Sequence, residues 1–276
     1  MANIIYTVLF GDTDTLKPPV HTPGWDHVCI TDDPDLRGVG WDVEFVGATF
    51  DDMDPKRRSR AYKINPPLTA DRSFYVDATF RIRHDLTDLL RDRAGIWLFP
   101  HPMRDCAYRE AAVILEKNLD LPLTVEAQIT RYRTEGFPEH YGLWRCGAML
   151  RERSCDELNQ VWWDEISRGT WRDQLSFPYA CWKTGVTPRP FLTNLVDVFL
   201  QQSLHKPHKT DDWKFTGKKP DWGVKERHPF AHLVITPNGL YMPRWVNKYI
   251  SLTWGSERFI ELTKSLNGIV EYEGRR

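Results

Sequence analysis

Short apolar runs alternate with segments of helical periodicity along most of the chain. The first run, Asn3 to Phe10, is rich in Ile, Tyr, Val and Leu, which is typical of a central parallel strand buried on both faces. Further strands are predicted at 28–31, 41–46, 73–76, 95–100 and 142–150. Helices are predicted around 57–63 and at 86–90, 106–115, 123–135, 154–168 and 171–182. This alternation predicts an α/β fold.

The pattern changes in the last third of the chain. Segments 205–209 and 214–227 are polar, interrupted by Pro and Gly, and show no periodicity, which indicates a long loop. Ser256 to Leu266 resembles a closing helix, with Gly268 just beyond its end. We therefore expect a main catalytic domain over 1–204. A loop and helix extension over 205–276 is expected to pack on it as a lid or on the acceptor side.

Composition places the chain among globular proteins. A length of 276 residues with 41% hydrophobic content is enough to bury a substantial core. The 37 basic and 38 acidic residues give a net charge of -1, so no global attraction to nucleic acid or to an anionic membrane is expected. The cysteines are odd in number and form no C-x-x-C pair, which predicts reduced core thiols: Cys29, Cys106, Cys146, Cys155 and Cys181.

The sequence shows no targeting or membrane signal. The opening run MANIIYTVLFGDTD has no basic leader and no small-residue cleavage site, so it is interpreted as a first strand and not as a signal peptide. No run reaches the roughly 18 apolar residues that a membrane-spanning helix needs. We expect a cytoplasmic protein without a membrane span.

The stretch from Lys56 to Arg83 carries the main candidate site. Its predicted helix bears four cations, and the strand that follows ends at Asp77. Ligands of open α/β sheets bind at the carboxyl ends of strands. Cations beside a lone carboxylate suggest a phosphate group with Mg²⁺ or Mn²⁺, and hence a sugar nucleotide. The alternative is a solvated helix face, with Asp77 as a turn cap.

Two other strand ends carry polar candidates. Thr31-Asp32 and the segment from Tyr6 to Gly11 would hold a nucleoside, although Asp-Asp-Pro at 32–34 is also ordinary turn chemistry. His101 and Arg104 lie at a predicted strand-to-helix junction, where backbone N–H groups favour an anion. They would form a pocket wall with Asp105.

For the junction at His101 and Arg104, the alternative to an anion-binding pocket is a purely structural role. In it, Asp105 caps the helix, and Arg109 and Glu110 face solvent. Inside the 142–150 strand, Gly147 would let another backbone or a ligand approach closely. His205 and His208 are candidate metal ligands, although isolated histidines are more often surface groups.

Several motifs together resemble a known family. In chain order they are YTVLFGDTDTLKPP, VCITDD, RSRAYK, SFYVDATF, HPMRDCAYREA, GLWRCGAML and WRDQLSFPYACWK. They resemble the glycosyltransferase-like family catalogued as domain of unknown function 616 and cover about the first two-thirds of the chain. More distantly, they are similar to the retaining transferases of the glycogenin and lipopolysaccharide galactosyltransferase type.

In those transferases a basic helix precedes a strand that ends in Asp-X-Asp. The corresponding positions here are Arg57, Arg60 and Lys63 on the helix, followed by Asp77-Ala78-Thr79. A small-residue strand corresponds to Cys146-Gly147-Ala148, the Asp-Gln pair to Asp173-Gln174, and the late His-Lys-Pro to 205–207. The second acid is replaced by Thr79, whose hydroxyl is a weaker metal ligand, so strong metal dependence is not expected.

The resemblance implies a GT-A-like fold, a mixed sheet flanked by helices, and sugar transfer from a nucleoside diphosphate sugar. It places Arg57, Arg60 and Lys63 at the donor, Asp77 and His205 at Mn²⁺ or Mg²⁺, and Asp173 with Gln174 at the anomeric centre. A transition state of oxocarbenium character leaving a diphosphate needs such charges. No strong general base is evident, which suits retention. Donor contacts are expected from Tyr6, Asp32, Arg57, Arg60, Lys63, Asp77, Thr79 and Gly147.

Two other classes of protein stay open from the sequence. One is a non-catalytic carbohydrate-binding protein that kept the fold with a decayed Asp-X-Asp. The other is a metal-dependent hydrolase built on Asp77, His101, His205 or His208, although no H-E-x-x-H spacing is present. The acceptor is equally open: a glycan, a lipid-linked sugar, a protein or a modified nucleic-acid base.

Overall fold

A computed structural model describes residues 2–11, 14–47, 53–152, 155–192, 197, 199–202, 234–236 and 239–241. The chain forms two compact units, Met1–His208 and Lys209–Arg276. In the second unit the described part is an antiparallel pair of strands, β10 (Val234–Thr236) and β11 (Gly239–Tyr241). The predicted loop at 205–227 and the helix at 256–266 lie outside the described residues. How the two units associate therefore stays a prediction.

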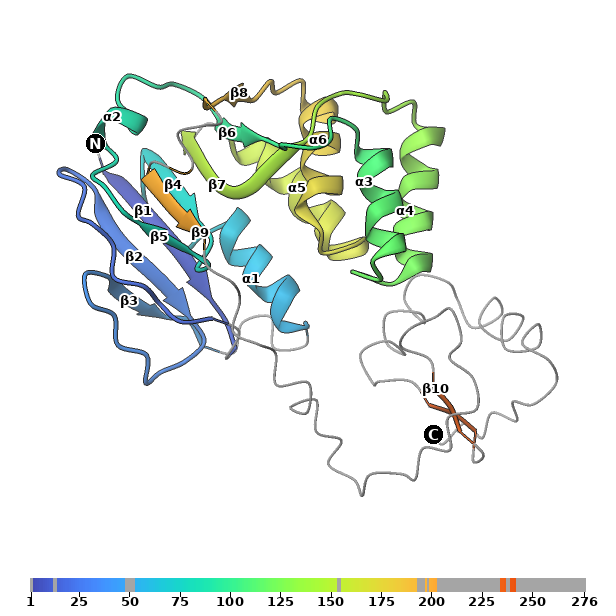
Figure 1. Cartoon of the computed structure of the whole chain (residues 1–276), viewed down its shortest axis with the longest axis horizontal. Helices are drawn as coiled ribbons and strands as arrows, with labels where there is room; N and C mark the ends of the chain where they lie inside the picture. Colours follow the sequence, from blue (N-terminus) through green and yellow to red (C-terminus); the bar gives the residue numbers. More distant parts are fainter. Residues whose placement is uncertain are drawn as a thin grey trace. The chain divides into compact units, whose positions relative to one another are not determined.

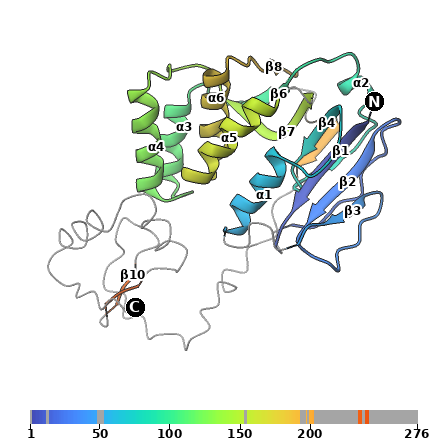
Figure 2. The same ribbon diagram turned by 180° about the vertical axis from the view of Figure 1, so that it is seen from behind.

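The first unit is built on a seven-stranded mixed sheet (Figures 1 and 2). Its strand order is β3-β2-β1-β4-β7-β6-β8. Strand β1 runs parallel to β2 and β4, whereas β7 is antiparallel to β4 and β6. The strands are β1 (Asn3–Leu9), β2 (Asp26–Thr31), β3 (Asp42–Phe45), β4 (Arg72–Val76), β6 (Trp97–Pro100), β7 (Trp144–Glu152) and β8 (Arg189–Pro190).

The helices lie near the positions that the periodicity predicts. They are α1 (Pro55–Ile64), α2 (Thr87–Leu90), α3 (Ala107–Glu116), α4 (Pro122–Thr134), α5 (Asp156–Arg168) and α6 (Asp173–Thr184). Helix α1 begins after Asp54, whose carboxylate accepts hydrogen bonds from the N–H groups of Lys56 and Arg57, and Pro55 suits the first helical position. The expected α/β class, with a mixed sheet flanked by helices, is confirmed.

Both faces of the sheet are covered, which explains the unbroken apolar run of β1. On one face Tyr6 and Tyr75 pack with Tyr62 of α1. On the same side Met149 of β7 and Leu98 of β6 pack with α5 and α6. Strands buried on both faces need apolar residues at nearly every position.

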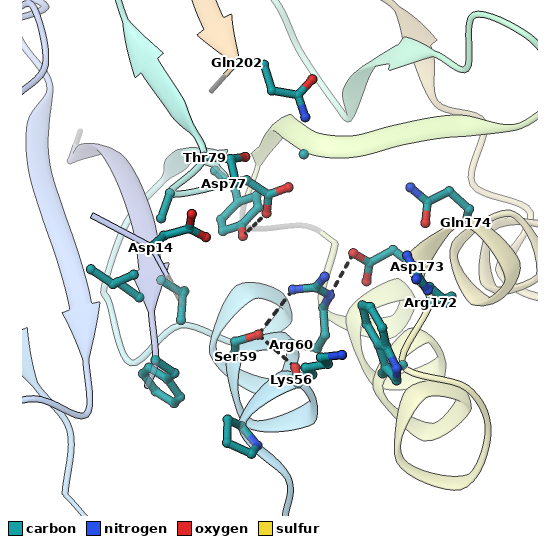
Figure 3. Close-up of a pocket in the computed structure, with 18 residues that line it drawn as sticks. Asp14, Lys56, Ser59, Arg60, Asp77, Thr79, Arg172, Asp173, Gln174 and Gln202 are labelled. Carbon is teal, nitrogen blue, oxygen red and sulfur yellow. Dashed lines mark hydrogen bonds and ion pairs between the residues drawn. The ribbon is translucent and has the colours of Figure 1, made fainter. Parts of the chain in front are cut away.

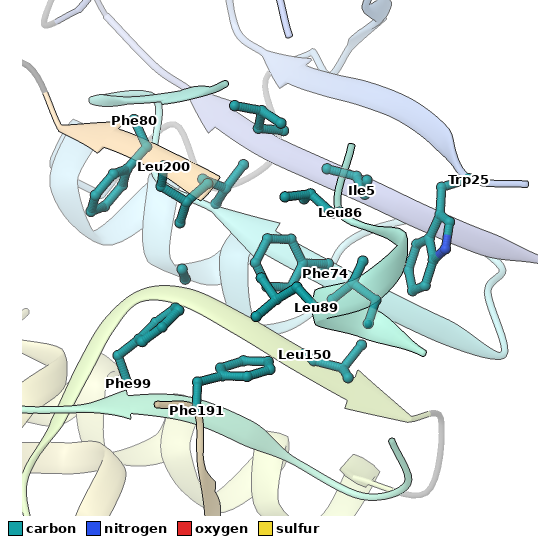
Figure 4. Packing of buried hydrophobic residues seen from close by; sticks show 14 of the residues in the cluster. Ile5, Trp25, Phe74, Phe80, Leu86, Leu89, Phe99, Leu150, Phe191 and Leu200 are labelled. Carbon is teal, nitrogen blue, oxygen red and sulfur yellow. The ribbon is translucent and has the colours of Figure 1, made fainter. Parts of the chain in front are cut away.

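The other face carries a second core, shown in Figure 4. Ile5 and Phe74 from the sheet pack with Leu89 of α2 and with Leu200. Leu200 belongs to β9 (Leu200–Gln202), which pairs antiparallel with β5 (Phe80–Ile82). This pairing brings Gln202 close to the loop that follows β4.

The five cysteines all lie in the described part of the chain, where each is buried and free. The prediction of reduced core thiols is confirmed, and burial raises the pKa of the Cys29 thiol to about 12.

Within the residues that the structure describes, no helix is long and apolar enough to cross a membrane.

Candidate functional site

A cavity of about 550 Å³ opens at the carboxyl ends of β1 and β4 (Figure 3). These strands are parallel neighbours, so their ends meet at one edge of the sheet. The volume lies within the range of small-molecule sites. The cavity is lined by Val8, Leu9, Phe10, Asp14, Pro55, Lys56, Ser59, Arg60, Tyr75, Asp77, Ala78, Thr79, Gly147, Trp171, Arg172, Asp173, Gln174 and Gln202.

Asp77 is fixed by three neighbours directly after β4. Its N–H donates to the carbonyl of Gly147 at 2.8 Å, and the Tyr75 hydroxyl donates to its Oδ1 at 2.5 Å. The ammonium of Lys63 lies 4.0 Å from the same Oδ1. Burial, and then the charge of Asp77, raise the pKa of Tyr75 well above its usual value, so its hydroxyl stays a donor at neutral pH.

Gly147 leaves room for this carboxylate. A Cβ at this position would lie 2.8 Å from Asp77 Oδ2 and 3.0 Å from a ring carbon of Phe80. The sequence predicted that a backbone or a ligand would approach this glycine, whereas the group that approaches it in the structure is the Asp77 side chain.

A buried ion-pair network joins α1 to the start of α6. Asp173 Oδ2 lies 2.6 Å from Lys63 Nζ and 3.0 Å from Arg60 Nε. The side chains of Lys63 and Asp173 are only 1% and 5% exposed. Burial lowers the pKa of Arg60, but the carboxylates of Asp173 and Asp77 outweigh it and raise that pKa overall. The guanidinium therefore stays charged.

An aromatic and cationic wall borders the same cavity. Lys56 Nζ lies 4.6 Å from the ring centroid of Trp171, and the guanidinium carbons of Arg172 and Arg60 lie at 4.0 Å and 5.6 Å. In Figure 3 Asp14, Asp77 and Thr79 appear on the opposite side of the cavity from Arg172. The cavity thus has Asp14 and Asp77 on one side, and Arg172 with the ion-paired Asp173 on the other.

The predicted site residues divide into two groups. The cavity brings together Arg60, Asp77, Thr79, Gly147, Asp173 and Gln174, with Lys63 directly behind them. Tyr6, Asp32 and Arg57 are not among the lining residues. The Tyr6 hydroxyl donates to the carbonyl of Lys63 at 2.5 Å. Its role is thus to support α1 from the sheet.

Asp32 and Arg57 bind neighbouring parts of the chain and do not line the cavity. Asp32 accepts from the N–H of Gly11 at 2.9 Å and pairs with Arg58 at 2.6 Å. The Arg57 guanidinium pairs with Asp54 at 2.8 Å and donates to the carbonyl of Gly169 at 2.7 Å. Both contacts anchor α1 and its neighbouring loops.

His101, Arg104 and Asp105 are also not among the lining residues. Arg104 Nε pairs with Glu110 at 2.5 Å, and Asp105 pairs with His140 at 2.8 Å. Helix α3 begins after Cys106 without a side-chain cap, and Glu110 is buried. The structural alternative was therefore wrong for Asp105 and Glu110, because both have other partners.

Several lining residues were missed from the sequence. Lys56 lies four residues before Arg60 on α1, a helical spacing that places both on one face. Trp171 and Asp14 also line the cavity, and neither was among the residues predicted for the site. No sequence signal connects Gln202 to the site, since it arrives through the β5–β9 pairing.

A divalent cation would find two carboxylates here besides the ion-paired Asp173. Asp14 and Asp77 both line the cavity. Mg²⁺ commonly binds through one or two carboxylates and completes its shell with water and substrate phosphates, so this donor set fits a phosphate-bridged ion. Among the described residues no group of three or more His, Cys, Asp or Glu could hold a metal by itself. His205 lies outside the described residues.

Comparison with known proteins assigns no family to this chain. No family model matches the chain, and no curated protein matches it in sequence. A solved structure that is similar is that of mouse xyloside xylosyltransferase 1 in its apo form, with a TM-score of 0.37 and 10% identity over 71% of this chain and 90% of that one. A likeness at this level establishes neither family nor activity, so the resemblance to the domain 616 family stays a prediction.

Proposed function

We propose that this protein is a glycosyltransferase that moves a sugar from a nucleoside diphosphate sugar to an acceptor. The observation that carries the proposal is the cavity itself. It collects Arg60, Asp77, Gly147 and the Asp173-Gln174 pair from four separate stretches of sequence. A carboxylate, a permanent cation and an amide in one cavity suit a ligand that has both a diphosphate and a sugar.

In this proposal the donor diphosphate lies near Arg60 and Asp77. Arg60 offers a charged guanidinium, and Asp77 with Asp14 would share Mg²⁺ or Mn²⁺ with the phosphate oxygens. Such an ion would neutralise the charge that develops on the departing diphosphate. Thr79, in place of a second acid of the motif, contributes a hydroxyl for the sugar or for a bound water.

Asp173 and Gln174 have different roles. Asp173 is held by Lys63 and Arg60, so we assign it to positioning these cations and to the electrostatics near the sugar. The Gln174 amide lines the cavity without such an ion pair and is our candidate for contact with the sugar at its anomeric face. Both cations already lie close to Asp173 Oδ2, so we do not assign this carboxylate as a general base.

The expected reaction is therefore assisted by the leaving group. The bond between the anomeric carbon and the phosphate oxygen breaks, and the acceptor hydroxyl oxygen bonds to that carbon. The hydroxyl proton passes to the departing diphosphate, which avoids the need for a protein base. Attack on the face from which the diphosphate leaves gives retention of configuration.

The test is turnover of a panel of nucleotide sugars with Mn²⁺ present. We expect slow release of a nucleoside diphosphate from at least one donor, and a released or transferred sugar whose first-formed anomer matches the donor in proton NMR. Gln174→Ala should reduce turnover more than donor affinity. An inverted first anomer would overturn the assignment of retention. Donor binding with no turnover of any kind would favour the non-catalytic carbohydrate-binding protein.

A further inference from the structure

Two cations of the cavity, Lys56 and Arg172, stand apart from the network around Asp173. Among the residues that the structure describes, neither forms an ion pair with a carboxylate. Arg172 donates to the carbonyl of Leu119 at 3.3 Å, and its Nε is buried without a hydrogen-bond partner in that part of the chain. Both side chains line the cavity. They therefore differ from Arg60, which is already engaged by Asp173.

Trp171 fixes the positions of the two cations. Lys56 Nζ lies 4.6 Å, and the guanidinium carbon of Arg172 lies 4.0 Å, from the centroid of its ring. Cation–π attraction keeps a charged group near the ring but does not neutralise it. The result is two positive charges held around one aromatic side chain.

The loop that carries Trp171 and Arg172 is anchored from several elements. Gly169 accepts from Arg57 of α1 at 2.7 Å, and the N–H of Thr170 donates to Gln128 of α4 at 2.8 Å. The hydroxyl of Thr170 and the N–H of Trp171 both donate to Asp120. Arg172 and the Trp171 ring beside Lys56 are thus held in place, which lowers the cost of ordering them around a ligand.

Bringing the cations together has an electrostatic cost. Desolvation, followed by the charge of Arg172, lowers the pKa of Lys56. Desolvation likewise lowers the pKa of Arg172, and the nearby charge of Arg60 acts in the same direction. The charge of Asp120 offsets part of this for both cations, although it forms no ion pair with either of them among the described residues. A bound anion would relieve the remaining repulsion.

We propose that Lys56, Trp171 and Arg172 form a second anion subsite of the cavity, which holds a phosphate group of the ligand. Arg offers paired donors to phosphate oxygens and Lys adds a point charge. The identity of the phosphate rests on the proposed function: it belongs either to the donor diphosphate or to a phosphorylated acceptor. The subsite itself does not depend on sugar transfer.

The test measures binding of inorganic pyrophosphate to the full-length protein by calorimetry. Lys56→Gln and Arg172→Gln should each weaken binding about tenfold, the usual loss for one charged hydrogen bond. Lys117→Gln is the matched control, because it removes the same charge from an exposed position at the end of α3 and should leave binding unchanged. Equal affinity in the wild type and in both cavity variants, or no binding by the wild type, would overturn the subsite.

Three further ligands identify the source of the phosphate: a nucleoside diphosphate, the uncharged nucleoside and a sugar phosphate. If it belongs to the donor, Arg172→Gln should weaken a nucleoside diphosphate and leave the uncharged nucleoside unaffected. If it belongs to the acceptor, the variant should weaken a sugar phosphate and leave the nucleoside diphosphate unaffected. Either pattern supports the subsite. A different result would separate the two proposals. If the variants lose pyrophosphate binding and the wild type binds no nucleotide sugar, the subsite stands and the proposed function is refuted.

Discussion

Lys63 Nζ lies 2.6 Å from Asp173 Oδ2, and both side chains are almost entirely buried. The pair connects the last turn of α1 to the first residue of α6. Two charges removed from water in this way are stable only together, because each would otherwise leave an uncompensated charge in the interior.

Replacing Lys63 with Met should therefore destabilise the fold. We expect a loss of roughly 3 kcal/mol in the free energy of unfolding, near the lower end for breaking a buried pair, since Arg60 still neighbours Asp173. Urea denaturation at neutral pH measures it. The matched control is Lys56→Met on the same helix, which should change stability by less than about 0.5 kcal/mol. Equal midpoints for the two variants would show that the pair has no structural role.

Gly147→Ala should separate stability from activity. The new methyl group would displace the Asp77 carboxylate, which lies at the end of a movable side chain, so the stability loss should be about 1 kcal/mol. A small displacement of a functional group costs far more in rate, and we expect kcat/KM to fall by about a hundredfold. Gly47→Ala, where a Cβ meets nothing within 4 Å, is the control. Unchanged kcat/KM in Gly147→Ala would exclude Asp77 from the reaction.

Acid should destabilise the protein partly through Glu135. Its hydrogen bond from Lys183, and then that from Tyr179, lower its pKa from 4.5 to about 2. A carboxyl with a lowered folded-state pKa contributes stability above the unfolded value and loses it as the pH falls toward the folded value. Glu135→Gln should therefore be less stable than the wild type at neutral pH and should approach it between about pH 4.5 and 2.

The measurement for Glu135 is a series of urea midpoints across this pH range. Glu116→Gln, at an exposed position of α3, should run parallel to the wild type throughout. A constant difference between Glu135→Gln and the wild type at every pH would contradict the assigned cause.

Chelation should weaken donor binding without abolishing it. Arg60, Lys56 and Arg172 supply positive charge that EDTA does not remove, so we expect the affinity for a bound nucleotide sugar to fall by less than about tenfold. Titration calorimetry with and without EDTA measures this. Asp77→Asn should respond less to EDTA than the wild type does, since one of the two carboxylates proposed to hold the ion is gone. A variant that responds as strongly as the wild type would assign the ion elsewhere.

Much of the sheet was predictable because its strands are apolar on both faces. The acid after β4 and the cations of α1 were predictable as well, since a helix and the next strand along the chain pack together in α/β folds. The glycine in β7 was a further sign, and the structure explains it by the Asp77 carboxylate. Local patterns thus identified the residues at the centre of the cavity.

The remaining lining residues depend on partners that sequence spacing does not reveal. Trp171 and Arg172 reach the cavity because Arg57, Asp120 and Gln128 hold their loop, and these contacts span 42 to 112 positions along the chain. For the same reason Arg57 was predicted to contact the donor, whereas its guanidinium binds Asp54 and Gly169.

Equilibrium binding of a panel of nucleoside diphosphate sugars, measured by titration calorimetry with Mn²⁺ present, tests the central claim most directly. The wild type should bind at least one of them, and Asp77→Asn should weaken that binding by up to about tenfold, as removal of the ion does. Asp88→Asn, at an exposed position of α2, should bind like the wild type. Binding of none of these donors by the wild type, or equal binding by the wild type and Asp77→Asn, would contradict the account.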